Sequence, residues 1–129
     1  WRVIRSFLED RTIEVNGTEW SMEKGCPQGS SLGPTLWLMV MEEWFVRMRE
    51  LELDGVRSQA YAHDQILVLS GTSVRRIARL WERVWRECEI WAGECKLKYN
   101  ERKTEAMFVP ARGRIRKPVV RLGEVRVET

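Results

Sequence analysis

Apolar residues recur every three to four positions in two long segments, which predicts two amphipathic helices. The first helix is expected from Leu32 to about Leu53, and the second from Val74 to Cys95. The second segment has the more regular apolar stripe, which we expect to pack in the core. Its members are Ile77, Leu80, Trp81, Val84, Cys88, Trp91 and Cys95. Residues 1–8 have the same spacing and predict a shorter helix.

Strict alternation of apolar and polar residues predicts β-strands elsewhere in the chain. Residues 12–15 and 19–22 flank Asn16-Gly17, a dipeptide that tolerates the positive φ angles of a tight hairpin turn. Residues 103–109 and 119–127 alternate in the same way and predict two further strands near the C-terminus, with Gly123-Glu124 as a candidate turn in the second. Locally paired strands with two long helices between them favour an α+β fold, in which helices cover an antiparallel sheet.

The composition fits one domain with a real core. The chain has 129 residues, of which 43% are hydrophobic and 32% charged, with a net charge of +3. This balance excludes a highly charged disordered tail, and no apolar run is long enough to cross a membrane. The odd count of three cysteines and the single histidine argue against a disulfide framework or a structural zinc site. We therefore expect reduced thiols and an intracellular protein, nuclear or cytoplasmic.

A loop rich in glycine and proline occupies residues 25–34, just before the first long helix. Three glycines and two prolines in ten residues are incompatible with a regular strand or a helix interior. The loop is explained by a tight connection that Ser30 or Ser31 caps. The structural explanation is favoured, but the loop would also allow a close approach of a phosphate or a flat ligand, because Gln28 precedes a helix N-terminus and glycines lack side chains.

A second hairpin is expected where residues 58–62 and 65–69 flank His63-Asp64. Turns favour Asp and tolerate His, so local structure alone accounts for both residues. A tight turn between two strands is also a rigid base from which polar side chains can hold a metal ion.

Two further features have simple structural explanations. The tryptophans and cysteines of residues 74–95 lie on the apolar stripe and are expected in the core, while the arginines of this helix form a solvated face. The basic segment 112–126 fits phosphate contacts and a solvated loop equally well.

Taken together, three motifs in this order resemble the reverse transcriptase domain of non-LTR (LINE-type) retrotransposons. Residues 25–37, GCPQGSSLGPTLW, are similar to that family's motif B. Residues 60–64, AYAHD, stand where the family has AYADD, the catalytic hairpin called motif C. Residues 97–107 resemble motif D, and residues 6–11 are similar to the segment that leads into motif B. The resemblance covers nearly the whole chain.

The resemblance implies an incomplete polymerase palm, with an antiparallel sheet backed by two long helices. We expect a single partial reverse transcriptase domain over residues 1–129. Its expected parts are the end of the fingers and palm region (1–24), the motif B loop and helix (25–53), the motif C hairpin (57–70), a helix with motif D (74–109) and a basic strand segment (112–129).

The resemblance also implies a set of site residues, a cofactor and partners. The catalytic positions are His63, Asp64 and Lys103, with Asp64 as a metal ligand and Lys103 near the triphosphate. Contacts with nucleotide and template are implied for Gly25, Pro27, Gln28, Gly29, Ser30 and Tyr61. The family uses Mg²⁺ or Mn²⁺ and acts on an RNA template, a DNA primer and deoxynucleoside triphosphates. The rest of a retrotransposon polyprotein is a further implied partner. The resemblance implies no contact with a membrane.

Two departures from the family pattern predict that this chain is inactive. His63 replaces the first aspartate of motif C, and neutral imidazole is a poor ligand for Mg²⁺. The family's first metal-binding aspartate, in motif A, belongs upstream of a segment like residues 6–11, and the chain begins too late to include it. Metal is therefore not expected to bind productively. The alternatives are a non-catalytic module that binds nucleic acid, or a decayed remnant of the palm.

Overall fold

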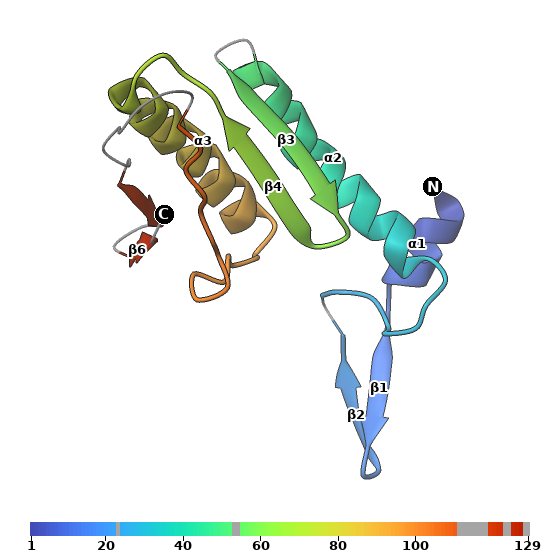
Figure 1. Cartoon of the computed structure of the whole chain (residues 1–129). Helices are drawn as coiled ribbons and strands as arrows, with labels where there is room; N and C mark the ends of the chain where they lie inside the picture. The colour runs from blue at the N-terminus through green and yellow to red at the C-terminus, as the bar shows by residue number, and fades with distance from the viewer. Residues whose placement is uncertain (23, 53–54, 111–118, 123–124, 128–129) are drawn as a thin grey trace. The chain divides into compact units, whose positions relative to one another are not determined.

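The computed structural model describes the whole chain except residues 23, 53–54, 111–118, 123–124 and 128–129. It contains three helices and three antiparallel strand pairs among the described residues (Figure 1). In chain order they are α1 (Arg2–Leu8), β1 (Thr12–Val15), β2 (Thr18–Ser21), α2 (Gly33–Leu51), β3 (Val56–Tyr61), β4 (Asp64–Leu69), α3 (Val74–Glu94), β5 (Val120–Leu122) and β6 (Val125–Val127). Two compact units comprise residues 1–37 and 38–129.

The first unit consists of α1, the β1–β2 hairpin and the glycine-rich loop. Asn16 and Gly17 both have positive φ, +53° and +77°, so the two-residue turn has the φ signs of type I′. This confirms the hairpin that the Asn-Gly dipeptide predicts. None of the described residues of the first unit is buried, so this unit lacks a core of its own.

The second unit has its core between α2 and α3, beside the β3–β4 hairpin (Figure 1). The largest fully buried side chains are Trp44 from α2 and Trp91 from α3. The Trp91 indole N–H donates to the Val40 carbonyl oxygen at 3.3 Å. The full set of buried apolar residues is Met41, Trp44, Met48, Leu51, Val56, Leu80, Val84, Cys88, Trp91 and Ala92. Most of the buried residues that α3 contributes belong to the apolar stripe predicted from the sequence. Three members of that stripe, Ile77, Trp81 and Cys95, are only half-buried.

A charged cluster closes the solvent edge of this interface. Arg47 of α2 lies 2.8 Å from Glu43 on its own helix. It also reaches two carboxylates of α3, Glu87 at 3.6 Å and Glu94 at 2.5 Å. Because the Arg47 side chain is only 21% exposed, this cluster is better shielded from solvent than an ordinary surface ion pair. It therefore fixes the two helices against each other.

The α+β class, with antiparallel strands and two long helices, is confirmed, but two details differ from the sequence prediction. The described strands pair only in twos, and no continuous sheet joins the three ribbons. The strand predicted for residues 103–109 is wrong, because this segment has no strand assignment. Its residues alternate between half-buried and exposed from Thr104 to Val109. The alternation in the sequence thus reflects contact with the domain on one side rather than pairing with a neighbouring strand.

The segment predicted as a strand over residues 119–127, with a candidate turn at Gly123-Glu124, forms a short ribbon of two strands. β5 and β6 pair antiparallel, with Val120 opposite Val127. The indole N–H of Trp81 in α3 donates to the Arg121 carbonyl oxygen at 2.7 Å, which attaches β5 to the helix. Residues 112–118 of the predicted basic segment lie outside the described residues, as do residues 123–124 at the turn.

Gly55 closes the open end of the β3–β4 hairpin. Its φ is +96°, and a Cβ atom built on it would lie 2.6 Å from the Ser70 carbonyl oxygen. Ser70 in turn donates to the Gly55 carbonyl oxygen, from its backbone N–H at 2.8 Å and its hydroxyl at 3.1 Å. A side chain at position 55 would therefore disturb both the turn and the last pair of the hairpin.

We expect Gly55→Ala to lower the free energy of unfolding by about 2 kcal/mol, because alanine is strained at positive φ and its Cβ meets backbone. Gly93→Ala is the matched control. Gly93 lies in α3 with nothing within 4 Å of an added Cβ, so we expect a gain of about 0.5–1 kcal/mol. Urea denaturation followed by circular dichroism measures both, and equal effects of the two substitutions would contradict the role given to Gly55.

Candidate functional site

The tip of the β3–β4 hairpin carries the residues that the sequence singles out. Tyr61 pairs with Asp64 across a two-residue turn of Ala62 and His63. Ala62 has φ of +51°, whereas His63 has no positive φ, which are the φ signs of a type II′ turn. An L-residue other than glycine is strained at such an angle. The two strands therefore impose the shape of this turn.

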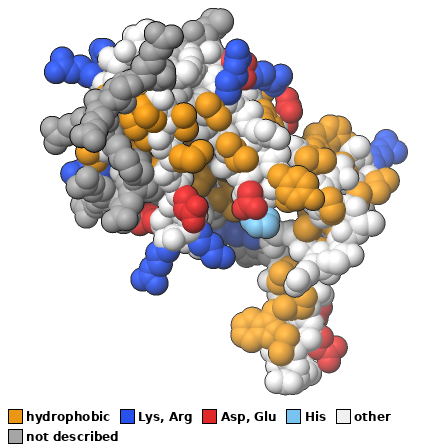
Figure 2. Space-filling model, in the orientation of Figure 1, with side chains coloured by type: hydrophobic (Ala, Val, Ile, Leu, Met, Phe, Trp, Pro, Cys, Tyr) orange, Lys and Arg blue, Asp and Glu red, His pale blue; other side chains and the backbone are white. Residues whose placement is uncertain are grey.

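The side chains at the tip point into solvent. The exposed fraction is 84% for Tyr61, and for the side chains of His63 and Asp64 it is 83% and 80%. The single histidine is visible on the surface in Figure 2. Its Nε2 atom lies 3.8 Å from Asp64 Oδ1, which is too long for a hydrogen bond. This exposed pair adds little to stability, and both groups are free to face a ligand.

The donor set at the tip does not fit a two-magnesium site by itself. Mg²⁺ prefers oxygen ligands in octahedral geometry, and the tip offers one carboxylate and one imidazole. Within the described residues, no three His, Cys, Asp or Glu side chains converge to hold a metal ion. Asp64 is thus the one side chain of the tip with the donor chemistry that magnesium prefers.

A half-buried polar contact anchors the hairpin just below the tip. Gln65, the residue after Asp64, faces inward and is half-buried. Its Oε1 atom accepts a hydrogen bond of 2.8 Å from the Tyr99 hydroxyl, and its amide nitrogen lies 3.6 Å from the Met41 sulfur of α2. The Tyr99 ring also packs on Trp85 of α3, with ring centroids 5.1 Å apart. These contacts link the strand that carries Asp64 to both long helices.

The surroundings of Tyr99 are poorly solvated. Burial raises the pKa of the Tyr99 phenol, and the neighbouring Cys88 raises it further. Burial also raises the pKa of the Cys88 thiol, and contacts with Trp44 and Tyr99 oppose this only in part. Cys88 is therefore a protonated, apolar core residue, as its position on the stripe predicts.

Sequence reasoning missed Gln65 and Tyr99 as supports of the hairpin. The signal for Gln65 was its place on the inward face of an alternating strand, where a polar side chain needs a partner. Tyr99 gave no comparable signal, because it lies in an irregular segment after α3.

The glycine-rich loop lies in the first unit and is held by short-range contacts. The Ser30 N–H donates to the Pro27 carbonyl oxygen at 3.1 Å, and the Ser30 hydroxyl oxygen accepts from the Leu32 N–H at 3.2 Å. Gly25 and Gly29 have φ of +73° and +83°, so both positions favour glycine. The Ser30 hydroxyl thus stabilises the turn just before α2, since Leu32 precedes the first residue of that helix, Gly33.

The remaining predicted site residues are accessible. Pro27, Gln28 and Gly29 are exposed in the loop, and Ser30 is half-buried. Lys103 is exposed in a turn, where its N–H donates to the Asn100 carbonyl oxygen at 3.1 Å. The loop belongs to the first unit and the hairpin to the second, so their meeting at one site stays a prediction.

Comparisons of the sequence with known proteins identify the family of this chain. Residues 1–124 match the profile of the reverse transcriptase (RNA-dependent DNA polymerase) family, and the chain belongs to this family. This confirms the family that the motifs indicate, and the relatives fit its non-LTR branch. No solved structure matches the chain significantly.

The curated relatives are encoded by retrotransposable elements. A Pol polyprotein of the type-1 element R1 from Nasonia vitripennis is 31% identical over 66% of this chain and 24% of its own length. A putative 115 kDa protein of element R1DM from Drosophila melanogaster is 27% identical over 91% of this chain and 11% of its own. The RNA-directed DNA polymerase of the mobile element jockey, also from Drosophila melanogaster, is 28% identical over 78% and 12%.

The chain spans a quarter or less of the length of these relatives. Among the described helices, none combines the length and apolar character needed to span a bilayer.

We expect Tyr99→Phe to lower the free energy of unfolding by about 1 kcal/mol, because it removes the donor to Gln65 and leaves the amide oxygen unpaired below the tip. Tyr61→Phe removes the same hydroxyl from an exposed side chain and should change stability by less than about 0.5 kcal/mol. Urea denaturation distinguishes the two variants. A loss as large for Tyr61→Phe would show that the anchor is not specific to Tyr99.

Stability should also fall in alkaline solution. The native state keeps protons on Cys88 and Tyr99 that the unfolded chain releases near about 8.5 and about 10. Because the native state then binds more protons, its stability is fully present below about pH 8 and decreases as the pH rises above 9. Denaturation between about pH 7 and 11 tests this. The fall above pH 10 should be smaller in Tyr99→Phe than in Tyr61→Phe.

Proposed function

We propose that this chain is a palm segment of an RNA-directed DNA polymerase of a non-LTR retrotransposon, and that its motif C hairpin no longer supports nucleotidyl transfer. The observation that carries the proposal is the pair at the hairpin tip, where His63 stands beside Asp64 and both side chains are at least 80% exposed. The tip is a tight turn between two paired strands, at the position that the resemblance to motif C gives to the catalytic aspartates, and its donor set differs from that motif.

The change at position 63 alters the chemistry in two ways. Two-metal transfer needs carboxylates that hold both ions, so that one ion activates the attacking hydroxyl and the other supports the leaving group. Imidazole supplies nitrogen in place of the oxygen that Mg²⁺ prefers. A protonated imidazole would in addition repel the cations. Asp64 alone therefore does not hold the ions in a reactive geometry.

The glycine-rich loop retains features that suit contact with a nucleotide or template base. Pro27, Gln28 and Gly29 are exposed, and the absence of a side chain at Gly25 and Gly29 lets a flat ligand approach the backbone closely. We assign Gln28 the polar contact in this loop and Ser30 and Tyr61 supporting contacts. Lys103 would offset negative charge on a triphosphate.

The implied cofactor and partners follow from the family. The parent enzyme would use Mg²⁺ or Mn²⁺, an RNA template, a DNA primer and deoxynucleoside triphosphates. Relatives of this chain are named as Pol polyproteins, so the other partner would be the rest of such a polyprotein.

Primer extension on an RNA template tests the proposal. We expect no incorporation by the wild-type chain with Mg²⁺ or Mn²⁺, because one carboxylate at the tip does not hold two ions. His63→Asp restores only one of the implied carboxylates and should not restore extension. Incorporation by the wild type above a buffer control would contradict the inactivity.

Metal binding gives a second readout that does not need catalysis. Mn²⁺ should broaden the NMR signals of residues 61–65 more strongly in His63→Asp than in the wild type, since two adjacent carboxylates bind a hard cation better than one. The double substitution His63→Asp with Asp64→Asn is the matched control. It has a single carboxylate at the tip, so it should not show the additional broadening expected for His63→Asp. Equal broadening in all three proteins would show that the tip is not the metal-binding position.

A thermal melt distinguishes a folded module that binds nucleic acid from a decayed remnant of the palm. A non-cooperative unfolding transition would identify the remnant.

A further inference from the structure

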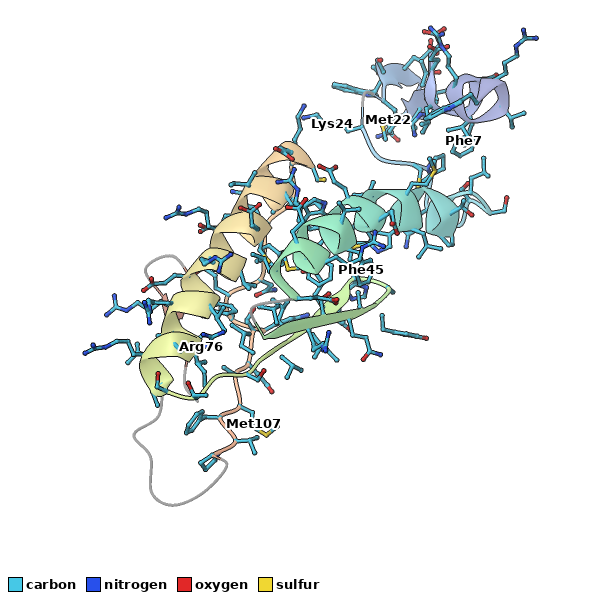
Figure 3. The ribbon with its side chains drawn as sticks, turned by 90° about the horizontal axis from the view of Figure 1, so that it is seen from above. Phe7, Met22, Lys24, Phe45, Arg76 and Met107 are labelled. Carbon is cyan, nitrogen blue, oxygen red and sulfur yellow. The ribbon has the colours of Figure 1, made fainter. Side chains whose placement is uncertain are left out.

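The outer face of α3 is an unbroken arginine surface. Five exposed arginines occupy consecutive turns at its N-terminal half: Arg75, Arg76, Arg79, Arg83 and Arg86. At about 100° per residue, they fall within about 100° of the helix circumference. The buried residues of α3, such as Val84 and Cys88, lie on the opposite side. Figure 3 shows side chains that end in nitrogen projecting from this helix, away from α2 and the hairpin.

Carboxylates border this surface on both of its edges. Glu82 and Glu89 lie along one edge. Glu87 and Glu94 lie along the other edge, where both pair with Arg47 of α2. Within the described part of the chain, no carboxylate lies within ion-pair distance of Arg75, Arg79 or Arg86. The face therefore keeps a net positive charge over about three helical turns.

We propose that this arginine surface binds the sugar–phosphate backbone of a nucleic acid strand. The proposal goes beyond the polymerase hairpin and loop, since it concerns the side of α3 turned away from β3 and β4. Residues four apart on a helix are separated by about 6 Å along the axis, which is close to the spacing of successive phosphates in one strand.

The composition of the surface favours phosphate over other acidic ligands. All basic residues of α3 are arginines, and the guanidinium group binds phosphate oxygens through two parallel hydrogen bonds. The arginine face carries no aromatic side chain on which a base could stack, so the contact should follow the backbone and not the sequence. A protein with an acidic surface is the competing partner.

Fluorescence anisotropy with a labelled single-stranded RNA of mixed sequence, and with an RNA–DNA hybrid, tests the proposal on the full chain. The test variant replaces Arg75, Arg79 and Arg86 with Gln, which keeps helix propensity. The matched control replaces Arg2, Arg5 and Arg49 with Gln. It removes the same charge from exposed positions in α1 and α2. Circular dichroism confirms that each variant retains its helices.

Each phosphate contact contributes about 0.7 to the slope of log affinity against log salt for a single strand. The α3 variant should therefore lose about 2 from this slope. Between about 50 and 200 mM salt, the wild-type affinity should fall about 20-fold more than that of the α3 variant. A third variant with Lys at the same three positions should keep the slope, because the charge remains.

Three results would overturn the proposal. An equal loss of salt-dependent RNA affinity in the α3 variant and in the control would mean that only the net charge of the protein matters. An unchanged slope in the α3 variant would exclude phosphate contacts by this face. Loss of binding to poly-L-glutamate in the α3 variant, with unchanged RNA binding, would identify an acidic protein as the partner.

Discussion

The contact between α2 and α3 is the interaction on which the second unit depends. Trp44 and Trp91 fill the space between the helices, and burial of such large side chains supplies most of the free energy of packing in a domain of this size. The Arg47 cluster then fixes the helices at the solvent edge. With this pair in place, the hairpin has a surface to lie on, and α3 presents its arginines outward.

The same helix therefore serves two chemically different surroundings. Its inner face supports the hairpin through Trp85 and Tyr99, which reaches Gln65 directly behind Asp64. Its outer face is entirely cationic over three turns. Under the proposals above, this one helix would both support the hairpin and retain a polyanionic strand. The hairpin tip carries one carboxylate, Asp64, and the contacts below it anchor the strand to both long helices.

Local patterns in the sequence predicted the elements well, and contacts between elements only in part. Asn16-Gly17 specified its turn because the φ angles of that turn are a property of the dipeptide itself. The apolar stripe located the inner face of α3 for the same reason. The prediction of a strand at residues 103–109 was wrong, because alternation of apolar and polar residues indicates burial on one side. It does not show whether a neighbouring strand pairs with the segment. The Tyr99–Gln65 hydrogen bond joins positions 34 residues apart, a separation that no local pattern encodes. The motif singled out the residues of the tip, but it gave no sign of the contacts that support them from below.

The left-handed backbone of Ala62 shows what sets the shape of the hairpin tip. The turn holds that geometry although alanine disfavours it, so the paired strands, and not the preference of Ala62, set the backbone path at the apex. Histidine at the apex presents an imidazole where the resemblance to motif C implies a carboxylate, so the ligand type of the tip differs from that motif. Under the proposed inactivity, the shape of this turn and its metal chemistry are separate properties, because the paired strands set the first and the side chains of His63 and Asp64 set the second.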